Sequence, residues 1–173
     1  MIQALVAVDK FGGMGLNGTL PWPHHAEDMS YFKKLTMGHV VVMGRNTWDD
    51  PKLPKPLVDR TVYVATTKLL PFSGGAKKIS GDIKEQLVAL ESKHPDKIIW
   101  VIGGASLLAQ CDGVLDKMYI THHKKSYKVD CKVDLYSFLS GWQLHTASAA
   151  PGTNCAFVTY EPLFKRAKPA LNR

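Results

Sequence analysis

Hydrophobic residues fall along the chain in two alternating patterns. Short apolar runs rich in β-branched residues predict buried strands at 2–8, 39–43, 61–65, 98–102 and 114–121. Apolar residues at helical spacing predict helices at 27–35, 82–92 and 107–109, with a short helix capped by Asn46 or Thr47 and a helical turn or loop at 134–139. Strands that alternate with helices over the first two-thirds predict a largely parallel, doubly wound sheet. The last strands, 142–147 and 156–161, predict an antiparallel pair, so the expected fold is a single-domain α/β mixed sheet, mainly parallel with an antiparallel C-terminal strand.

Two loops follow the first strand closely. Four glycines between positions 12 and 18 predict a mobile loop, and such a loop beside a binding site can act as a lid. Pro21 and Pro23 then flank Trp22, and because both prolines resist a helix interior, this segment also reads as a loop. The two loops together mark one place where the chain could enclose a ligand.

Asp28 is the residue on which the functional prediction depends. It opens a predicted helix and shares an apolar face with Phe32 and Leu35 at i+4 and i+7, whereas its neighbour Glu27 lies on a wetter side. The carboxylate could simply cap backbone N–H groups and suit the positive end of the helix dipole. It could instead lie at the bottom of an apolar cleft, with a raised pKa and the N–H groups of a ligand as partners. This segment alone leaves both interpretations open.

Composition narrows the class of protein. The 173 residues suffice for one domain, which we place at 1–164, followed by a basic and solvated tail at 165–173. Three cysteines without C-x-x-C spacing argue against a disulfide framework and favour a reducing compartment. The first residues have no signal-peptide pattern and no apolar run is as long as a membrane span. We therefore expect a cytoplasmic protein without membrane contact and without an obligate protein partner.

The net charge of +7 comes from scattered basic residues. They form no long block and no aromatic ladder accompanies them, so nucleic acid is not an expected partner. A small polyanionic ligand fits this charge better. The histidines at 24–25 and 122–123 are adjacent pairs that point apart on a strand or helix, so no metal site is expected.

Two junctions join a strand, glycine and a helix, at 43–47 and at 102–106. Backbone N–H groups at such a junction can hold a phosphate, and the carboxyl ends of parallel strands form a ligand crevice. Arg45 lies at the first junction, and Thr66, Thr67 and Lys68 end the strand at 61–65. Cations with neighbouring hydroxyls suit an additional phosphate, which favours NADPH over NADH as the cofactor.

Several short motifs follow one another along the chain in a characteristic order and spacing. They are Leu5-Val6-Ala7 in the first strand, Leu20-Pro21-Trp22 at the end of the glycine-rich loop, Asp28 four residues before Phe32, Met43-Gly44-Arg45-x-Thr47-Trp48, Leu57 three residues before Arg60, Val101-Ile102-Gly103-Gly104, and Tyr119-Ile120-Thr121-His122. With this set the chain resembles dihydrofolate reductase over nearly its whole length. The motifs are specific together, although each alone is weak.

The resemblance implies a role for each matching residue. Asp28 would bind the 2-amino and ring N–H groups of a pterin, with Thr121 reaching this acid through water and Arg60 binding the glutamate carboxylate of the substrate. Trp22 and Leu20 would close over the nicotinamide. The remaining implied substrate-binding residues are Leu5, Val6, Phe32 and Leu57. The implied cofactor-binding residues are Ala7, Met14, Gly15, Gly44, Arg45, Asn46, Thr47, Thr66, Thr67, Lys68, Ile102, Gly103, Gly104, Ala105, Ser106 and Leu107, with the Gly103–Gly104 peptide cis.

The implied activity is the NADPH-dependent reduction of 7,8-dihydrofolate, with hydride transfer from nicotinamide C4 to pterin C6 and a proton delivered to N5 by water. Dihydrofolate and antifolate-like small molecules are the implied partners. One alternative keeps the fold and cofactor but reduces a different heterocycle, as the pyrimidinone reductases of riboflavin synthesis do. Another is a binding or structural protein that holds NADPH without turnover. Asp28, Phe32 and Arg60 together argue against the first alternative, because its substrate carries no glutamate tail. The retained acid and hydride crevice argue against the second.

Overall fold

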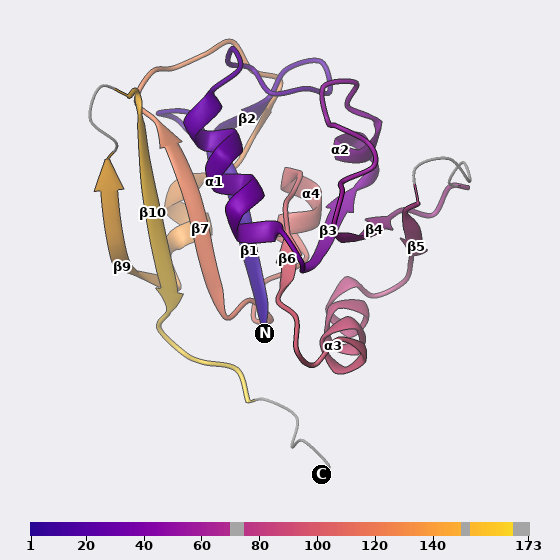
Figure 1. The fold of residues 1–173 in the computed structure, drawn as a ribbon. Coiled ribbons are helices and arrows are strands. Elements are labelled where there is room, and N and C mark those ends of the chain that lie inside the picture. Colours follow the sequence, from indigo (N-terminus) through magenta and orange to yellow (C-terminus); the bar gives the residue numbers. More distant parts are fainter. Residues whose placement is uncertain (70–74, 150–152, 168–173) are drawn as a thin grey trace.

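A computed structural model describes residues 1–69, 75–149 and 153–167 of the chain. Within these residues, eight strands form one sheet in the order β5-β4-β3-β6-β1-β7-β10-β9. Its strands are β1 (Ile2–Val8), β3 (Val40–Gly44), β4 (Thr61–Ala65), β5 (Lys77–Ile79), β6 (Ile99–Val101), β7 (Lys117–His123), β9 (Trp142–Ala149) and β10 (Cys155–Pro162). All neighbours from β5 to β7 are parallel, and β10 is antiparallel to both β7 and β9. The predicted mixed and mainly parallel sheet is confirmed (Figure 1).

The central strands β1, β3 and β6 are buried on both faces because they are apolar on both sides. The helices are α1 (Ala26–Thr36), α2 (Arg45–Asp49), α3 (Ile83–Lys93), α4 (Ala105–Ala109) and α5 (Leu135–Leu139). On one face, Ala4 and Val6 of β1 pack in a cluster with α3 and α4 residues such as Leu87. On the other face, Leu5 packs in a cluster that α1 completes with Phe32. Alternate residues of one strand therefore serve two layers of helices, as a doubly wound fold requires.

Three short strands were not expected from the sequence. Strand β5 consists of two exposed lysines and one buried isoleucine, so it carries no continuous apolar run. Strands β2 (Gly13–Gly15) and β8 (Cys131–Lys132) pair with each other, antiparallel, outside the main sheet. The pairing joins the glycine-rich loop to a segment more than a hundred residues later, and no local pattern in either segment indicates it.

Two further expectations were wrong in detail. The N-cap of α2 is Gly44 without a side-chain hydrogen bond, and Asn46 and Thr47 lie inside the helix instead of capping it. At the other end of the chain, Arg166 is not solvated: its side chain is 11% exposed and forms ion pairs with Glu91 and Asp116. The boundary at residue 164 stays a prediction, and residues 168–173 of the predicted tail lie outside the described residues. Across the part of the chain that is described, no helix is long and apolar enough to cross a membrane.

Candidate active site

The two glycine junctions meet because β3 and β6 are neighbours in the sheet. The backbone N–H of Gly44 donates a hydrogen bond to the carbonyl oxygen of Gly103 at 2.8 Å. Gly103 has a φ of +102°, a conformation that side chains rarely adopt, and the peptide between Gly103 and Gly104 is cis, as the resemblance implies. The carboxyl ends of two parallel strands thus form one continuous floor, where a ligand is expected in a doubly wound fold.

A crevice of about 620 Å³ lies over this floor. Its walls come from the ends of β1, β3 and β6, the glycine-rich loop, α2 and α4. The predicted cofactor residues that line it are Ala7, Met14, Gly15, Gly44, Arg45, Asn46, Thr47, Ile102, Gly104, Ala105, Ser106 and Leu107, and Val6 and Leu20 line it as well. Gly103, Thr66, Thr67 and Lys68 are not among its lining residues. The structure therefore brings most of the predicted cofactor residues together around one cavity.

The glycine-rich loop is held against the crevice by strand pairing and hydrogen bonds that the sequence did not predict. Strand β2 pairs with β8, the Asp130 N–H donates to the Gly15 carbonyl at 3.0 Å, and the Asn17 N–H donates to Asp130 Oδ2 at 2.8 Å. Asp130 and Cys131 also line the crevice. The loop therefore forms a wall of the cavity, and its role as a lid stays a prediction.

Trp22 is buried, and within the protein it contacts two other aromatic rings. Its indole stacks on the His123 imidazole, with ring centroids 4.0 Å apart, and meets the Tyr127 ring edge-on. Trp22 is not among the residues that line the crevice. A direct contact between Trp22 and the nicotinamide thus stays a prediction, and the indole secures the loop that carries Leu20.

Asp28 is half-buried and faces the sheet from the first turn of α1. The Thr121 hydroxyl, 1% exposed, donates to Asp28 Oδ1 at 2.6 Å. The resemblance implied a water between these groups, and the direct bond corrects that expectation. Burial raises the pKa of Asp28, which the Thr121 hydrogen bond and the field of His25 partly oppose. Since Thr121 pairs in register with Ala7, which lines the crevice, the acid is anchored beside the cavity.

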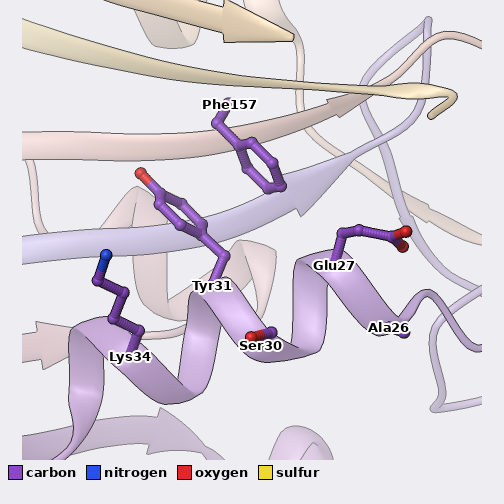
Figure 2. Close-up of a pocket in the computed structure, with 6 residues that line it drawn as sticks. All are labelled: Ala26, Glu27, Ser30, Tyr31, Lys34 and Phe157. Atoms are coloured by element: carbon purple, nitrogen blue, oxygen red, sulfur yellow. The ribbon is translucent and has the colours of Figure 1, made fainter. Parts of the chain in front are cut away.

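Glu27, the competing acid, lies on a different face of α1. Its side chain is 54% exposed and lines an open groove together with Tyr31, Lys34 and Phe157 of β10. Figure 2 shows the Tyr31 and Phe157 rings turned toward each other over this groove, and their centroids are 4.3 Å apart. The helical spacing therefore predicted the positions of both carboxylates correctly: Asp28 lies on the inner side of α1 and Glu27 on its exposed side.

Arg60, the predicted anchor of a substrate carboxylate, is already oriented by the protein. Its Nη1 donates to Thr36 Oγ1 at 3.2 Å and its Nε donates to the Val58 carbonyl at 3.0 Å. The guanidinium carbon lies 5.9 Å from the centroid of the Phe32 ring. Leu57 is buried in the same apolar cluster that contains Leu5 and Phe32. Leu5, Phe32 and Leu57 thus share one side of the sheet with α1, whereas Val6 lies on the opposite face, in the cluster with α3 and α4.

The predicted phosphate-binding residues lie at the ends of β3 and β4. Arg45 is held by Asp49, with Nε 2.7 Å from Oδ2, and by the Leu69 carbonyl at 2.9 Å, so part of its charge is already neutralised. Lys78 of β5, which the sequence did not single out, donates from Nζ to the Thr67 carbonyl at 2.9 Å. The register between β4 and β5 places Lys78 beside the end of β4. Sequence analysis missed this lysine because β5 has no apolar pattern that predicts a strand.

A cysteine and two histidines lie together behind Asp28. Cys155 Sγ is 3.3 Å from His25 Nε2 and 3.3 Å from His123 Nδ1. His25 caps α1, because its Nδ1 accepts a hydrogen bond from the Asp28 N–H at 3.4 Å. Burial raises the pKa of the Cys155 thiol to about 11, so it stays protonated and packs as a neutral group. In the described ranges, no group of three or more histidine, cysteine, aspartate or glutamate side chains is arranged to hold a metal ion.

Known proteins match the chain over most of its length. The sequence profile described as dihydrofolate reductase matches residues 1–161. Dihydrofolate reductase type 9 of Escherichia coli is 33% identical over 148 residues, which is 83% of this chain and 81% of that protein. A viral dihydrofolate reductase of Saimiriine herpesvirus 2 is 30% identical over 153 residues, 80% of this chain and 72% of that protein.

A solved structure has the same fold. It is described as dihydrofolate reductase from Enterococcus faecalis complexed with NADP(H) and RAB-propyl, and it is 24% identical in sequence with a TM-score of 0.79. The match covers 94% of this chain and 96% of that one. Sequence profile and relatives agree, and the chain therefore belongs to the dihydrofolate reductase family and is a nicotinamide-dependent oxidoreductase.

Proposed function

We propose that the protein reduces 7,8-dihydrofolate to 5,6,7,8-tetrahydrofolate with NADPH, by hydride transfer from nicotinamide C4 to pterin C6 and protonation at N5. One observation carries this proposal: a half-buried carboxylate, Asp28, is fixed by the Thr121 hydroxyl beside a crevice floored by Gly44, Gly103 and Gly104. Such an acid is suited to a flat heteroaromatic ring that presents adjacent N–H groups.

Asp28 would orient the pterin through its second carboxylate oxygen. Thr121 donates to Oδ1, and among the hydrogen bonds of the described residues none is donated to Oδ2. A ligand with two N–H groups can therefore bind without displacing a protein donor. The role of Asp28 would be to fix and polarise the pterin, and water would deliver the proton to N5. The surrounding apolar residues, Leu5, Phe32 and Leu57, would exclude bulk water.

Arg60 would bind the glutamate carboxylate of the substrate. Thr36 and Val58 hold its Nη1 and Nε, which orients the guanidinium before the substrate arrives. A guanidinium fixed in this way loses little side-chain entropy on forming a bidentate pair. The same features would bind antifolate-like molecules that present amino and ring N–H groups to Asp28.

The nicotinamide cofactor would lie in the crevice and supply the hydride when bound. Ala7, Met14 and Leu20 would contact the nicotinamide end, and the backbone N–H groups around Gly104 and Thr47 the phosphates. We infer NADPH, not NADH, because Thr66, Thr67 and Lys68 follow β4 beside Arg45. The Lys78 ammonium, 2.9 Å from the Thr67 carbonyl, adds a cation where an extra phosphate would lie.

The proposal extends to the surroundings of the enzyme. The protein would act in the cytoplasm as a monomer built from one domain at residues 1–164, without nucleic acid, membrane or an obligate protein partner. The scattered net charge of +7 fits a protein whose substrate and cofactor are both anionic, because a positive field raises their encounter rates.

A single assay tests the function against its rivals. The loss of NADPH absorbance is followed with dihydrofolate, with an aminopyrimidinone of riboflavin synthesis, and with neither. We expect turnover with dihydrofolate only, and at least a tenfold loss for Asp28→Asn at neutral pH with partial recovery in acid, where substrate is already protonated. Glu27→Gln is the matched control and should keep turnover. Oxidation only with the pyrimidinone, NADPH binding without oxidation, or a larger loss for Glu27→Gln would each overturn the proposal.

A further inference from the structure

Asp9 is a buried carboxylate that the proposed mechanism does not use. It follows β1 directly and is 2% exposed. Its Oδ1 accepts hydrogen bonds from the Phe11 N–H at 2.9 Å and the Gly13 N–H at 2.7 Å, and its Oδ2 accepts one from the Tyr127 N–H at 2.9 Å. All three donors are backbone groups, and they come from two different loops.

These bonds explain how a charge can be buried here. Burial raises the pKa of the carboxyl, but the N–H groups of Tyr127, Gly13 and Phe11 and the nearby His123 outweigh burial, so the pKa of Asp9 lies below its ordinary value. A buried carboxylate with three fixed donors is ionised and costly to release. It therefore joins the two loops more strongly than any one backbone bond between them.

The loops that Asp9 joins are the ones that enclose the crevice. Phe11 and Gly13 begin the glycine-rich loop, and the next two residues, Met14 and Gly15, line the crevice. Tyr127 belongs to the loop between β7 and β8, whose strand β8 pairs with β2. The Asp9 carboxylate thus fixes the first end of the loop, while Asp130 holds its middle through Asn17 and Gly15.

Gly13 shows that this arrangement is closely fitted. A Cβ atom at Gly13 would lie 2.9 Å from Asp9 Oδ1 and 2.6 Å from Val129 Cγ1, closer than real Cβ contacts. Any side chain at this position would push the N–H away from the carboxylate. Glycine at this position lets the backbone approach Asp9 closely, and a side chain here would force Asp9 or Val129 to shift.

We propose that Asp9 is a positioning residue that holds the glycine-rich loop closed over the crevice and so sets how fast the nicotinamide cofactor enters and leaves. This inference rests on the proposed function only in assuming that the cofactor occupies the crevice. Loss of the Asp9 acceptors frees the start of β2, and the wall formed by Met14 and Gly15 then opens more often. The carboxylate itself lies outside the lining of the crevice, so it acts through the loop.

The test uses Asp9→Asn, which keeps the size of the side chain. Its amide has one acceptor oxygen, so its NH₂ must face either the Tyr127 N–H or the Phe11 and Gly13 N–H groups, and those bonds are lost. Hydrogen exchange of the Gly13 and Tyr127 amides, measured without cofactor, should speed up about tenfold or more. The NADPH dissociation rate constant, measured by stopped-flow fluorescence, should rise by a similar factor, whereas kcat with saturating cofactor changes less.

Asp134→Asn is the matched control. Asp134 also accepts backbone N–H groups, those of Tyr136 and Ser137 at the start of α5, but none from the glycine-rich loop. It should leave both the exchange of the Gly13 amide and the NADPH dissociation rate unchanged. A variant that only loosened the fold would lower the melting temperature without a selective change in NADPH dissociation, and this outcome would overturn the inference.

If Asp9→Asn does not fold, amide hydrogen exchange of the wild-type protein tests the role of Asp9 instead. Because one carboxylate holds all three donors, the Phe11, Gly13 and Tyr127 amides should open with similar free energies. Widely different protection would overturn the anchor. Protection of the wild-type loop amides by NADPH separates the two proposals. Suppose that exchange speeds up in Asp9→Asn but NADPH does not protect the wild-type loop. Asp9 would then still hold the loop, but its control of cofactor exchange would be refuted, and the result would count against the proposed cofactor site.

Discussion

Replacing Thr121 with valine removes the hydroxyl that donates to Asp28 and leaves the side-chain shape nearly unchanged. Thr121 is 1% exposed, and its Oγ1 donates to Asp28 Oδ1 at 2.6 Å. The hydrogen bond favours the ionised form of Asp28, whereas burial favours the protonated form and raises the pKa. Without the hydroxyl, burial acts almost unopposed, so the pKa of Asp28 should rise further.

The size of this rise follows from the bond. A hydrogen bond to a charged group contributes about 1.5–3 kcal/mol, and one pKa unit corresponds to about 1.4 kcal/mol. Asp28 is only half-buried, and water can partly replace the hydroxyl, so the lower end of this range applies. We expect Thr121→Val to raise the pKa of Asp28 by about one unit.

The assay is a carboxyl ¹³C NMR titration of the free enzyme, with Asp28→Asn used to assign the signal. The acid limb of kcat/KM for dihydrofolate should move by the same amount, because the pterin N–H groups need an ionised acceptor. Glu27→Gln, on the outer face of α1, should leave the Asp28 titration in place. An unchanged Asp28 titration in Thr121→Val, or an equal shift in Glu27→Gln, would refute the assigned role of the hydroxyl.

Four further outcomes are expected. The raised pKa of Asp28 means that its contribution to stability is present at low pH and is lost as pH rises through the folded-state pKa. Asp28→Asn should therefore melt at a higher temperature than wild type at neutral pH. Below the ordinary carboxyl pKa the two proteins should melt at the same temperature. Arg60→Lys should raise the KM of dihydrofolate about tenfold with little change in kcat, and a substrate without the glutamate should show no difference. Lys78→Ala should weaken NADPH binding about tenfold and leave NADH binding unchanged in a fluorescence titration. Arg166→Met should lower the free energy of unfolding by about 2 kcal/mol in a denaturant titration, because Glu91 and Asp116 lose their shared cation and keep only the N-terminal ammonium and the Ile2 N–H as partners.

The parallel core of the sheet could be predicted because its strands are almost continuously apolar. Runs such as 40–44 and 99–101 are buried on both faces, and this burial leaves a strong signal in the sequence. Strand β5 escaped prediction because Lys77 and Lys78 are exposed at the edge of the sheet, where only the neighbouring strand fixes the backbone. The register with β4, not the local sequence, makes this segment a strand.

The inner position of Asp28 was predictable because helical spacing fixes which side chains share a face. The bond from Thr121 was predictable only through the resemblance, and as a bridged contact, since the two residues are 93 positions apart. The hydrogen bonds of Asp130 and of Asp9 also join loops that are more than a hundred positions apart in the sequence, and no periodic pattern indicates either of them. Arg166 was misinterpreted because a lysine- and arginine-rich end resembles a solvated tail until its two acidic partners are located in space.

The His123 ring on which Trp22 stacks gives the enzyme an acid response opposite in sign to that of Asp28. Burial lowers the pKa of His123 from its ordinary value of 6.5 to about 4, so the imidazole beneath the indole carries no charge in neutral or mildly acidic solution. The unfolded chain takes up this proton first, and acid therefore weakens the fold as pH falls from 6.5 towards 4, whereas the raised pKa of Asp28 makes acid strengthen it. A melting temperature that drops across this interval means that protonation of the imidazole outweighs protonation of the carboxylate, and one that rises means the reverse.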